Sequence, residues 1–319
     1  MTLIDDRRTA YLARVASLYY EQGKNQQEIA EDLGVSRPAV SRLLSEAREK
    51  GIVEITIHYP WRTSPELERR LCQAFQLRRA IVLVREQKSD EDMLVGLGIL
   101  ASHFFQDLLW DGMIIGISWG RALYQLIRAL TPRSLLQSEV VQFVGASGNE
   151  SSPTDGPLLA QLLSSRLGCQ CRYLYAPVIV DNAETRQSLL QSRSIRDTLD
   201  RASQCHVALV GIGSTAPELS SMQTARYLSV EELREMRRCG AVGDVCAHYY
   251  DINGRYLDIE VNRRTISVAR EDLAQIDLVI GVGGGEQKAD SILGALRGGY
   301  VNVLITDDLA AVKVLEQEQ

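Results

Sequence analysis

A run of three glycines followed by a lysine is the part of this 319-residue sequence best suited to hold an anion. Gly283, Gly284 and Gly285 follow an apolar segment at residues 278–282, and Lys288 lies three residues further on. Small residues let backbone N–H groups approach an anion closely, and the N-terminus of a following helix adds a favourable dipole. The spacing matches neither a Walker A loop nor the dinucleotide fingerprint. The sequence therefore indicates an anion site of another kind.

Three further loops have the same character, because each follows an apolar segment and is rich in glycine and small hydroxyl side chains. They cover residues 118–121, 145–150 and 211–215. Loops at the carboxyl ends of parallel strands gather at one edge of a sheet, where ligands bind. Together the four loops predict a pocket for a small phosphorylated or polyhydroxylated molecule, although each alone could simply form a tight turn. Asp244 could bind sugar hydroxyls there or serve as a turn former.

A second group of candidate contact residues lies near the N-terminus, around residues 36–49. Short polar side chains and arginines face away from the apolar stripe of that segment, and such side chains suit contacts to phosphates and base edges. The residues expected at or near DNA are Gln26, Arg37, Pro38, Ser41, Arg42 and Ser45. Arg37 and Arg42 are the best candidates for base or phosphate contact.

The segment at residues 26–49 predicts two helices joined by a tight turn, since apolar residues recur at helical spacing in both halves. Gly34 can take the left-handed conformation that ends a helix. Ser36 is expected to cap the second helix, with Pro38 in its first turn. This is the pattern of a helix-turn-helix, whose second helix enters the major groove of DNA. Residues 53–57 alternate in polarity and predict a strand, as in winged variants.

From residue 79 onwards apolar strands alternate with helices, which predicts an α/β domain built on a parallel, Rossmann-like sheet. The expected strands cover residues 80–84, 113–117, 140–144, 171–175, 207–211, 278–282 and 301–306. The expected helices cover residues 90–109, 120–130, 156–167, 185–193, 195–202, 229–238, 288–296 and 308–317. Residues 241–259 predict a hairpin about a turn at Asn253 and Gly254. We expect a DNA-binding domain at residues 1–59, a linker helix at 60–78 and a ligand-binding domain at 79–319.

The charge balance limits how tightly one subunit can bind DNA. The formal net charge is −6, and residues 1–60 carry eight basic and nine acidic side chains. Residues 34–50 are locally positive, with four basic and two acidic side chains. Few phosphates would be neutralised per subunit, so useful affinity requires two or more DNA-binding domains on one site and hence a homo-oligomer.

Cysteine usage and hydropathy bear on metals and location. The six cysteines form no C-x-x-C pair and have no histidine at zinc-ligand spacing, so no metal site is expected. Cys169 and Cys171 are expected to be neighbours in a strand. No signal peptide opens the sequence and no apolar run reaches the length of a membrane span, so no membrane partner is expected. Together with free thiols, this predicts a cytoplasmic protein.

With these residues laid out, the chain resembles the SorC family of bacterial transcriptional regulators, a sugar-binding group also labelled SorC/DeoR. Residues 26–44 match the family pattern Q-x-E-I-A-x-x-L-G-V-S-R-P-x-V-S-R-L-L. The C-terminal match comprises the three glycines with Lys288, followed by residues 298–307. Residues 116–120 and 240–258 also look familial, so the resemblance covers nearly the whole chain.

The resemblance implies more than the residues alone. Such proteins join an N-terminal helix-turn-helix to an effector domain similar to sugar-phosphate isomerases of the glucosamine-6-phosphate deaminase and ribose-5-phosphate isomerase type. They are typically tetramers that bind operators of carbohydrate operons, and a phosphorylated sugar alters that binding without catalysis or cofactor. The implied effector site comprises Ser118, Gly120, Arg121, Gly145, Ser147, Asn149, Gly213, Asp244, Gly284 and Lys288. Many relatives carry threonine where this chain has Arg121, which could grip a phosphate with two hydrogen bonds or narrow the pocket.

Two other functions remain open from the sequence. A sugar-phosphate isomerase or deaminase with a DNA-binding head would need a base tuned near neutral pH, such as Glu286 or Asp244. A nicotinamide-dependent repressor fits less well, because the glycine spacing differs from the dinucleotide fingerprint. The sequence does not identify the effector or the operator, nor whether the ligand releases or tightens DNA.

Overall fold

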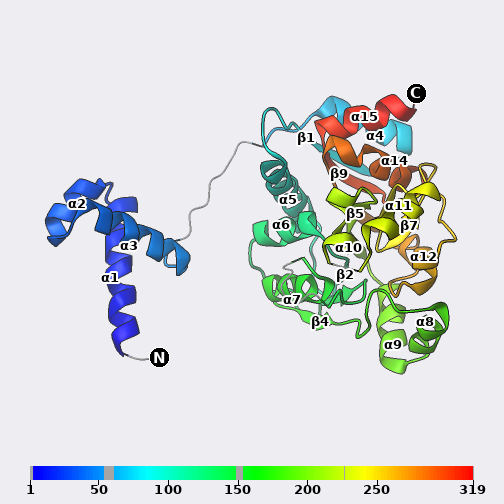
Figure 1. Cartoon of the computed structure of the whole chain (residues 1–319), viewed down its shortest axis with the longest axis horizontal. Helices are drawn as coiled ribbons and strands as arrows, with labels where there is room; N and C mark the ends of the chain where they lie inside the picture. Colours follow the sequence, from blue (N-terminus) through cyan, green and yellow to red (C-terminus); the bar gives the residue numbers. More distant parts are fainter. Residues whose placement is uncertain (1–2, 54–60, 149–153, 226, 319) are drawn as a thin grey trace. The chain divides into compact units, whose positions relative to one another are not determined.

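The computed structural model describes residues 3–53, 61–148, 154–225 and 227–318 (Figure 1). The chain divides into two compact units, Met1–Pro60 and Trp61–Gln319. Apart from Val53, the strand predicted at residues 53–57 lies outside the described residues. Within the described part of the chain, no helix combines the length and apolar character needed to cross a membrane.

The first unit holds three helices, α1 (Leu3–Tyr20), α2 (Gln26–Leu33) and α3 (Arg37–Glu49). All three helices contribute to one small core. Its buried side chains are Leu12, Val15, Ala16, Ile29, Ala30, Val40, Leu43, Leu44 and Ala47. The apolar stripes expected from the sequence face this core, and the predicted helix-turn-helix is confirmed.

Two residues fix the ends of α2. Asn25 caps its start, accepting hydrogen bonds from the N–H groups of Gln27 and Glu28 at 2.9 and 3.0 Å. Gly34 ends it with φ at +64°, in the left-handed conformation that the sequence predicts. Ser36 precedes α3 as expected, but its side chain makes no capping hydrogen bond.

The second unit is an α/β domain. Its strands are β1 (Arg79–Leu83), β2 (Ile114–Ile117), β3 (Glu139–Gln142), β4 (Gln170–Arg172), β5 (Val207–Ser214), β6 (Gly243–Val245), β7 (His248–Tyr250), β8 (Leu278–Val282) and β9 (Val303–Asp307). Its longer helices are α4 (Pro65–Phe75), α5 (Asp90–Gln106), α6 (Arg121–Ala129), α7 (Gly156–Leu167), α8 (Ala183–Leu190), α9 (Arg193–Ala202), α11 (Val230–Arg238), α14 (Ala289–Arg297) and α15 (Asp308–Glu318). Short helices are η1 (Pro217–Leu219), α10 (Ser221–Thr224), α12 (Glu260–Arg264), α13 (Arg270–Leu273) and η2 (Glu286–Lys288).

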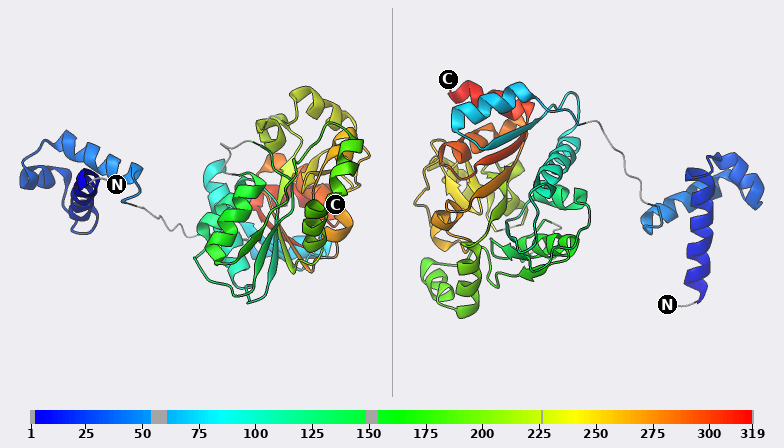
Figure 2. Two further views of the ribbon diagram at one scale, coloured as in Figure 1. Left: turned by 90° about the horizontal axis from the view of Figure 1, so that it is seen from below. Right: turned by 180° about the vertical axis from the view of Figure 1, so that it is seen from behind.

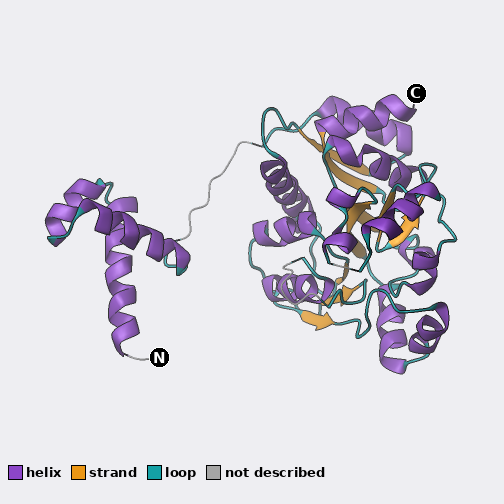
Figure 3. Cartoon of the chain, in the orientation of Figure 1, coloured by secondary structure: helices purple, strands orange, loops and turns teal. Residues whose placement is uncertain are grey.

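The main sheet is parallel, with strand order β1-β9-β8-β5-β2-β3-β4. Figures 2 and 3 show the strands of this unit surrounded by its helices. Helices α5, α6 and α7 cover one face, while α4, α14 and α15 cover the other face beside β1, β9 and β5. Helix α9 also contacts β3, and β2 and β3 are buried along their whole length, as expected for strands in the middle of a covered parallel sheet. The predicted fold class is therefore confirmed.

The hairpin between residues 241 and 259 differs from the prediction in its position. Its strands are β6 and β7, and the turn between them is formed by Cys246 and Ala247, with φ of +53° and +61°. Across the expected turn at Asn253 and Gly254, only an isolated bridge from Tyr250 to Tyr256 remains. A turn does form at Asn253, where the N–H of Gly254 donates to the carbonyl oxygen of Asp251 at 2.9 Å, but the two paired strands meet at the buried Cys246–Ala247 turn, which is bonded to a buried carboxylate described below.

Candidate effector pocket and DNA-binding surface

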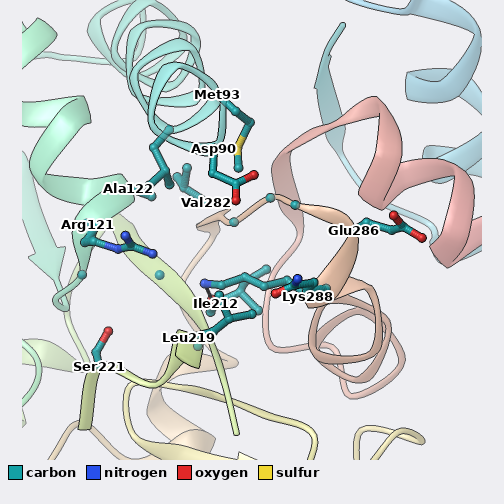
Figure 4. A pocket seen from close by; sticks show the side chains of 18 of the residues that line it. Asp90, Met93, Arg121, Ala122, Ile212, Leu219, Ser221, Val282, Glu286 and Lys288 are labelled. Carbon is teal, nitrogen blue, oxygen red and sulfur yellow. Dashed lines mark hydrogen bonds between the residues drawn. The ribbon is translucent and has the colours of Figure 1, made fainter. Parts of the chain in front are cut away.

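The carboxyl ends of three neighbouring strands, β2, β5 and β8, surround a pocket of about 220 Å³ (Figure 4). The loop after each of these strands contributes to its wall. Ligands bind at this edge in open α/β sheets. The volume lies below the range of roughly 300–1,000 Å³ typical of drug-sized ligands, so the pocket suits a small metabolite.

Six residues of the implied effector site line this pocket. They are Gly120, Arg121, Gly213, Asp244, Gly284 and Lys288. Gly120 and Arg121 follow β2, and Gly284 and Lys288 follow β8. Gly213 lies in β5, and Asp244 lies in β6, which pairs with β5.

Three other implied residues do not line the pocket. The Ser118 hydroxyl accepts a hydrogen bond from the N–H of Gly211 at 3.2 Å. The backbone N–H of Ser147 donates to Asp155, and a Cβ on Gly145 would lie 2.5 Å from a backbone oxygen. These residues hold loops together. The fourth, Asn149, lies outside the described residues.

Two glycines are required by close packing beneath the pocket. A Cβ on Gly213 would lie 2.0 Å from Oδ1 of Asp244, its partner in the β5–β6 pairing. A Cβ on Gly284 would lie 2.8 Å from Oδ1 of Asp307. The missing side chain at Gly213 lets the Asp244 carboxylate lie across β5 and reach the pocket.

Asp244 and Lys288 place opposite charges in this wall. Asp244 is 7% exposed, and its Oδ2 accepts a hydrogen bond from the N–H of Ala247 at 3.1 Å. Burial raises the pKa of Asp244 to about 6. Lys288 Nζ donates to the carbonyl oxygen of Ile212 at 2.7 Å, and burial lowers the pKa of Lys288 to about 8 although Asp244 opposes that shift.

Arg121 supplies a second cation from the opposite wall. It begins α6 directly after Gly120, whose φ of +120° favours glycine. Figure 4 shows Arg121 and Lys288 pointing toward one another across the pocket. The N-cap residue of α6 is Gly120, and no side chain in the described part of the chain caps this helix, so its first N–H groups are available to an anion. Within the described ranges Arg121 forms no ion pair, whereas Arg85 on the pocket wall pairs with Asp90 at 2.6 Å.

The expected DNA-contacting residues lie on the side of α3 away from its core. Arg37, Pro38, Ser41 and Arg42 are exposed, and Ser45 is half-buried. Gln26, at the start of α2, is also half-buried. Arg42 Nε lies 3.4 Å from the carbonyl oxygen of Pro38 one turn earlier on the same helix, and the residue is exposed. The arginines are therefore accessible to a duplex.

Comparison with known proteins covers both units. Residues 59–316 match the family described as "Putative sugar-binding domain", and residues 13–50 match the helix-turn-helix family "Sigma-70, region 4". The sorbitol operon regulator of Klebsiella pneumoniae is 36% identical over 96% of this chain and 97% of its own length. The chain belongs to the SorC family of sugar-binding transcriptional regulators.

Other relatives agree with this SorC-family assignment. The deoxyribonucleoside regulator of Bacillus subtilis is 33% identical over 96% of this chain and 97% of its own length. The crystal structure of full-length SorC from Klebsiella pneumoniae superposes with a TM-score of 0.72 at 35% identity, covering 98% of this chain and 99% of that protein. These relatives span the whole domain order, from DNA-binding unit to sugar-binding unit.

In this SorC-family chain, the two carboxylates considered as catalytic bases differ in placement. Glu286 lines the pocket, but its carboxylate is directed toward α15, where it forms an ion pair with Lys313 at 3.3 Å (Figure 4). Asp244 faces the pocket. Of these two carboxylates, Asp244 is therefore the better placed to meet a ligand as a proton acceptor or hydrogen-bond acceptor.

Several pocket residues of the SorC-family chain were missed from the sequence. They are Arg85, Asp90, Met93, Leu94, Ala122, Leu219, Ser221, Met222 and Leu309. A signal existed for Arg85, because it follows an apolar strand at the same sheet edge as the predicted loops. The short helices η1 and α10, which bring Leu219, Ser221 and Met222 to the pocket, have no periodic pattern that would reveal them.

Proposed function

We propose that the pocket binds a small phosphorylated sugar, and that its occupancy changes the affinity of the helix-turn-helix for the operator of a carbohydrate operon. The observation that carries the proposal is the convergence of Arg121 and Lys288, from opposite walls, beside the uncapped start of α6. Guanidinium, ammonium and backbone N–H groups together form a strong site for a phosphate group.

The charges around the pocket support a phosphate rather than a neutral sugar alone. Arg85 is paired with Asp90, and Glu286 with Lys313 outside the pocket. Lys288 is attracted to Asp244. Pairing these groups leaves the positive charge of Arg121 without a partner in the described residues, and a phosphate would supply one.

The remaining wall suits the sugar end of the ligand. The Asp244 carboxylate can accept hydrogen bonds from hydroxyl groups, and Met93, Ile212 and Met222 offer apolar surface to the faces of a carbon chain. Relatives are named for sorbitol and for deoxyribonucleosides, so polyols, pentoses and their phosphates form the first panel to test.

We also propose that the boundary between the DNA-binding and effector parts lies near residue 60. We further propose that two or more subunits bind one operator. The near-neutral charge of residues 1–60 supports this, because one head neutralises few phosphates. The regulator would act in the cytoplasm, where bacterial operators lie.

Thermal shift and calorimetric titration test the effector class. We expect sorbitol 6-phosphate, 2-deoxyribose 5-phosphate or a related sugar phosphate to bind, and its unphosphorylated counterpart to bind at least about tenfold more weakly, the scale of one lost charge-assisted contact. Arg121→Gln and Lys288→Gln should each reduce affinity for the phosphorylated form and leave the weak affinity for the free sugar unchanged. Equal affinities for both forms would overturn the phosphate assignment.

The rival function is a sugar-phosphate isomerase or deaminase. A pKa of about 6 for Asp244 suits a general base, which is the observation in its favour. Incubation of the purified chain with the same panel distinguishes the two, because a regulator leaves the sugar phosphates unchanged. Conversion that Asp244→Asn abolishes would establish the enzyme, and a melting-temperature shift with NAD(H) would revive the nicotinamide alternative.

A further inference from the structure

The chain enters the second unit beside the effector pocket. Residues 62–64 run antiparallel along the free edge of β1, and the N–H of Val84 donates to the carbonyl oxygen of Arg62 at 2.8 Å. The next residue after Val84 is Arg85, which lines the pocket. The segment that leads to the DNA-binding unit is therefore hydrogen-bonded to the residue next to the pocket wall.

Arg85 holds the loop that connects β1 to α5. Its Nε donates to the carbonyl oxygen of Lys88 at 2.9 Å, and its guanidinium pairs with Asp90 at 2.6 Å. Glu86, in the same loop, has φ at +53°, which is unfavourable for a residue other than glycine. The loop conformation thus depends on the bonds that Arg85 makes.

The same loop contacts Trp61, the first residue of the second unit. Lys88 Nζ lies 5.6 Å from the centre of the Trp61 ring. Glu86 pairs with Lys88 at 3.1 Å and with Arg62 at 4.0 Å. The Trp61 ring also packs on α5, where a Cβ on Gly96 would lie 2.8 Å from it. Trp61 is held between the loop and α5.

We propose that the loop at residues 85–89 couples the pocket to the segment leading to the DNA-binding unit, with Arg85 and Trp61 as positioning residues; this rests on the proposed function. An anionic ligand competes with the exposed carboxylate of Asp90 for the Arg85 guanidinium. When Arg85 turns to the ligand, the Lys88 carbonyl loses its donor and the loop relaxes. Lys88 then leaves the Trp61 ring, so ligand occupancy changes how the entering segment is held.

Trp61→Ala in the full chain tests the coupling, with sorbitol 6-phosphate and 2-deoxyribose 5-phosphate as probes and fluorescence anisotropy on operator DNA as the readout. The ligand dissociation constant should change by less than about twofold, because Trp61 does not line the pocket. The ratio of operator affinities with and without ligand, typically about 5–150-fold in allosteric proteins, should fall to near one. Trp61→Phe, which keeps a ring, should retain most of the ratio.

Trp110→Ala is the matched control, because Trp110 is a tryptophan far from the pocket. It is 47% exposed and lies before the start of β2, whereas the pocket lies at the carboxyl end of that strand. It should keep the wild-type ratio. Should Trp61→Ala fail to fold, Lys88→Met removes the ammonium while keeping the apolar stem, and it should lower the ratio in the same direction. If Lys88→Met and Trp61→Ala both fold, bind the probe and keep the wild-type ratio of operator affinities, the coupling is overturned and the effector proposal stays intact. A wild-type protein whose operator affinity no probe changes overturns the proposed function itself.

Discussion

The exposed face of α3 and the effector pocket both present cationic side chains to an anionic partner, but they hold them differently. On α3, Arg42 is exposed, and among the described residues its side chain hydrogen-bonds to the Pro38 carbonyl one turn earlier. In the pocket, Lys288 is half-buried and fixed by a 2.7 Å bond to Ile212. Exposed charges are screened by salt, whereas burial lowers the pKa of Lys288 to about 8, so that its charge changes between pH 7 and pH 9. The affinity for DNA should therefore depend on ionic strength, and the affinity for the ligand should depend on pH and on the shape of the ligand.

The pocket also tolerates less change in volume than the DNA-contacting face, and Gly213→Ala sharpens this contrast most. The new Cβ would lie 2.0 Å from Oδ1 of Asp244, so the carboxylate or β5 must move. Overpacking of this kind costs typically about 1–3 kcal/mol, and a cost of that size borne by the pocket would lower ligand affinity by about 5- to 150-fold. Calorimetric titration with the sugar phosphate measures the loss.

A matched methyl addition in the first unit gives the control. Nothing lies within 4 Å of a Cβ built on Gly23, although its φ of +69° strains any other residue. Gly23→Ala should therefore affect the stability of that unit and leave ligand affinity unchanged. Wild-type ligand affinity in Gly213→Ala would mean that Asp244 is not held in the pocket as described.

Arg42→Ala tests the exposed half of the comparison. Loss of one base or phosphate contact, worth roughly 1–3 kcal/mol, should weaken operator binding at least about tenfold in a gel-shift titration. Arg69→Ala is a close match, because Arg69 is an exposed helical arginine whose Nε lies 3.3 Å from the carbonyl oxygen of Pro65 one turn earlier. It should leave operator affinity unchanged. Similar losses in both variants would mean that α3 is not the specific contact surface.

The two regions also differ in how far the sequence could predict them. The helix-turn-helix is a local pattern, so the stripe containing Ile29 and Val40 and the turn at Gly34 were found directly. The parallel strands were found because strands buried on both faces form uninterrupted apolar runs. The pocket was found only in part, since three of its walls come from loops whose glycines mark the carboxyl ends of strands.

Small residues explain why the predicted site includes positions that do not line the pocket. Gly145 and Ser147 follow a strand as the pocket glycines do, yet Gly145 is small because a backbone carbonyl approaches it. Packing and ligand binding demand the same residue types, so the sequence cannot separate them. Conversely, Met222 belongs to a four-residue helix, too short to show a period. The position of the β6–β7 turn depends on the bond from Ala247 to a buried Asp244, which local turn preferences do not contain.

The pH dependence of ligand binding is a further way to separate the two regions. With a pKa of about 8, Lys288 loses its charge between pH 7 and pH 9, so affinity for a sugar phosphate should fall by several-fold, and at most about tenfold per pH unit above 8. Lys288→Arg should flatten this dependence, because arginine stays charged in that range. Operator binding should instead follow salt concentration. A flat profile in the wild type would place Lys288 outside the phosphate site.

Asp244 and Lys288 also make the stability of the ligand-free domain depend on pH. The raised pKa of Asp244 contributes stability that is present below its ordinary value of 3.8 and lost as the pH rises through about 6. The lowered pKa of Lys288 contributes stability that is present above 10.5 and lost as the pH falls through about 8. Between pH 6 and 8 both groups are charged, so the empty pocket destabilises the domain most where a phosphate would bind best.

The smallest expected effect lies within the helix-turn-helix, where the two helix starts differ. Asn25→Ala removes the acceptor of two backbone N–H groups of α2 and should lower the free energy of unfolding of the first unit by about 1 kcal/mol. Ser36→Ala should change it much less, because the Ser36 side chain makes no capping bond to α3. Denaturant unfolding of the two variants measures both. Equal losses would mean that Ser36 caps α3 in solution; a small loss of stability combined with weaker operator binding would mean that its hydroxyl is left free to meet a DNA phosphate.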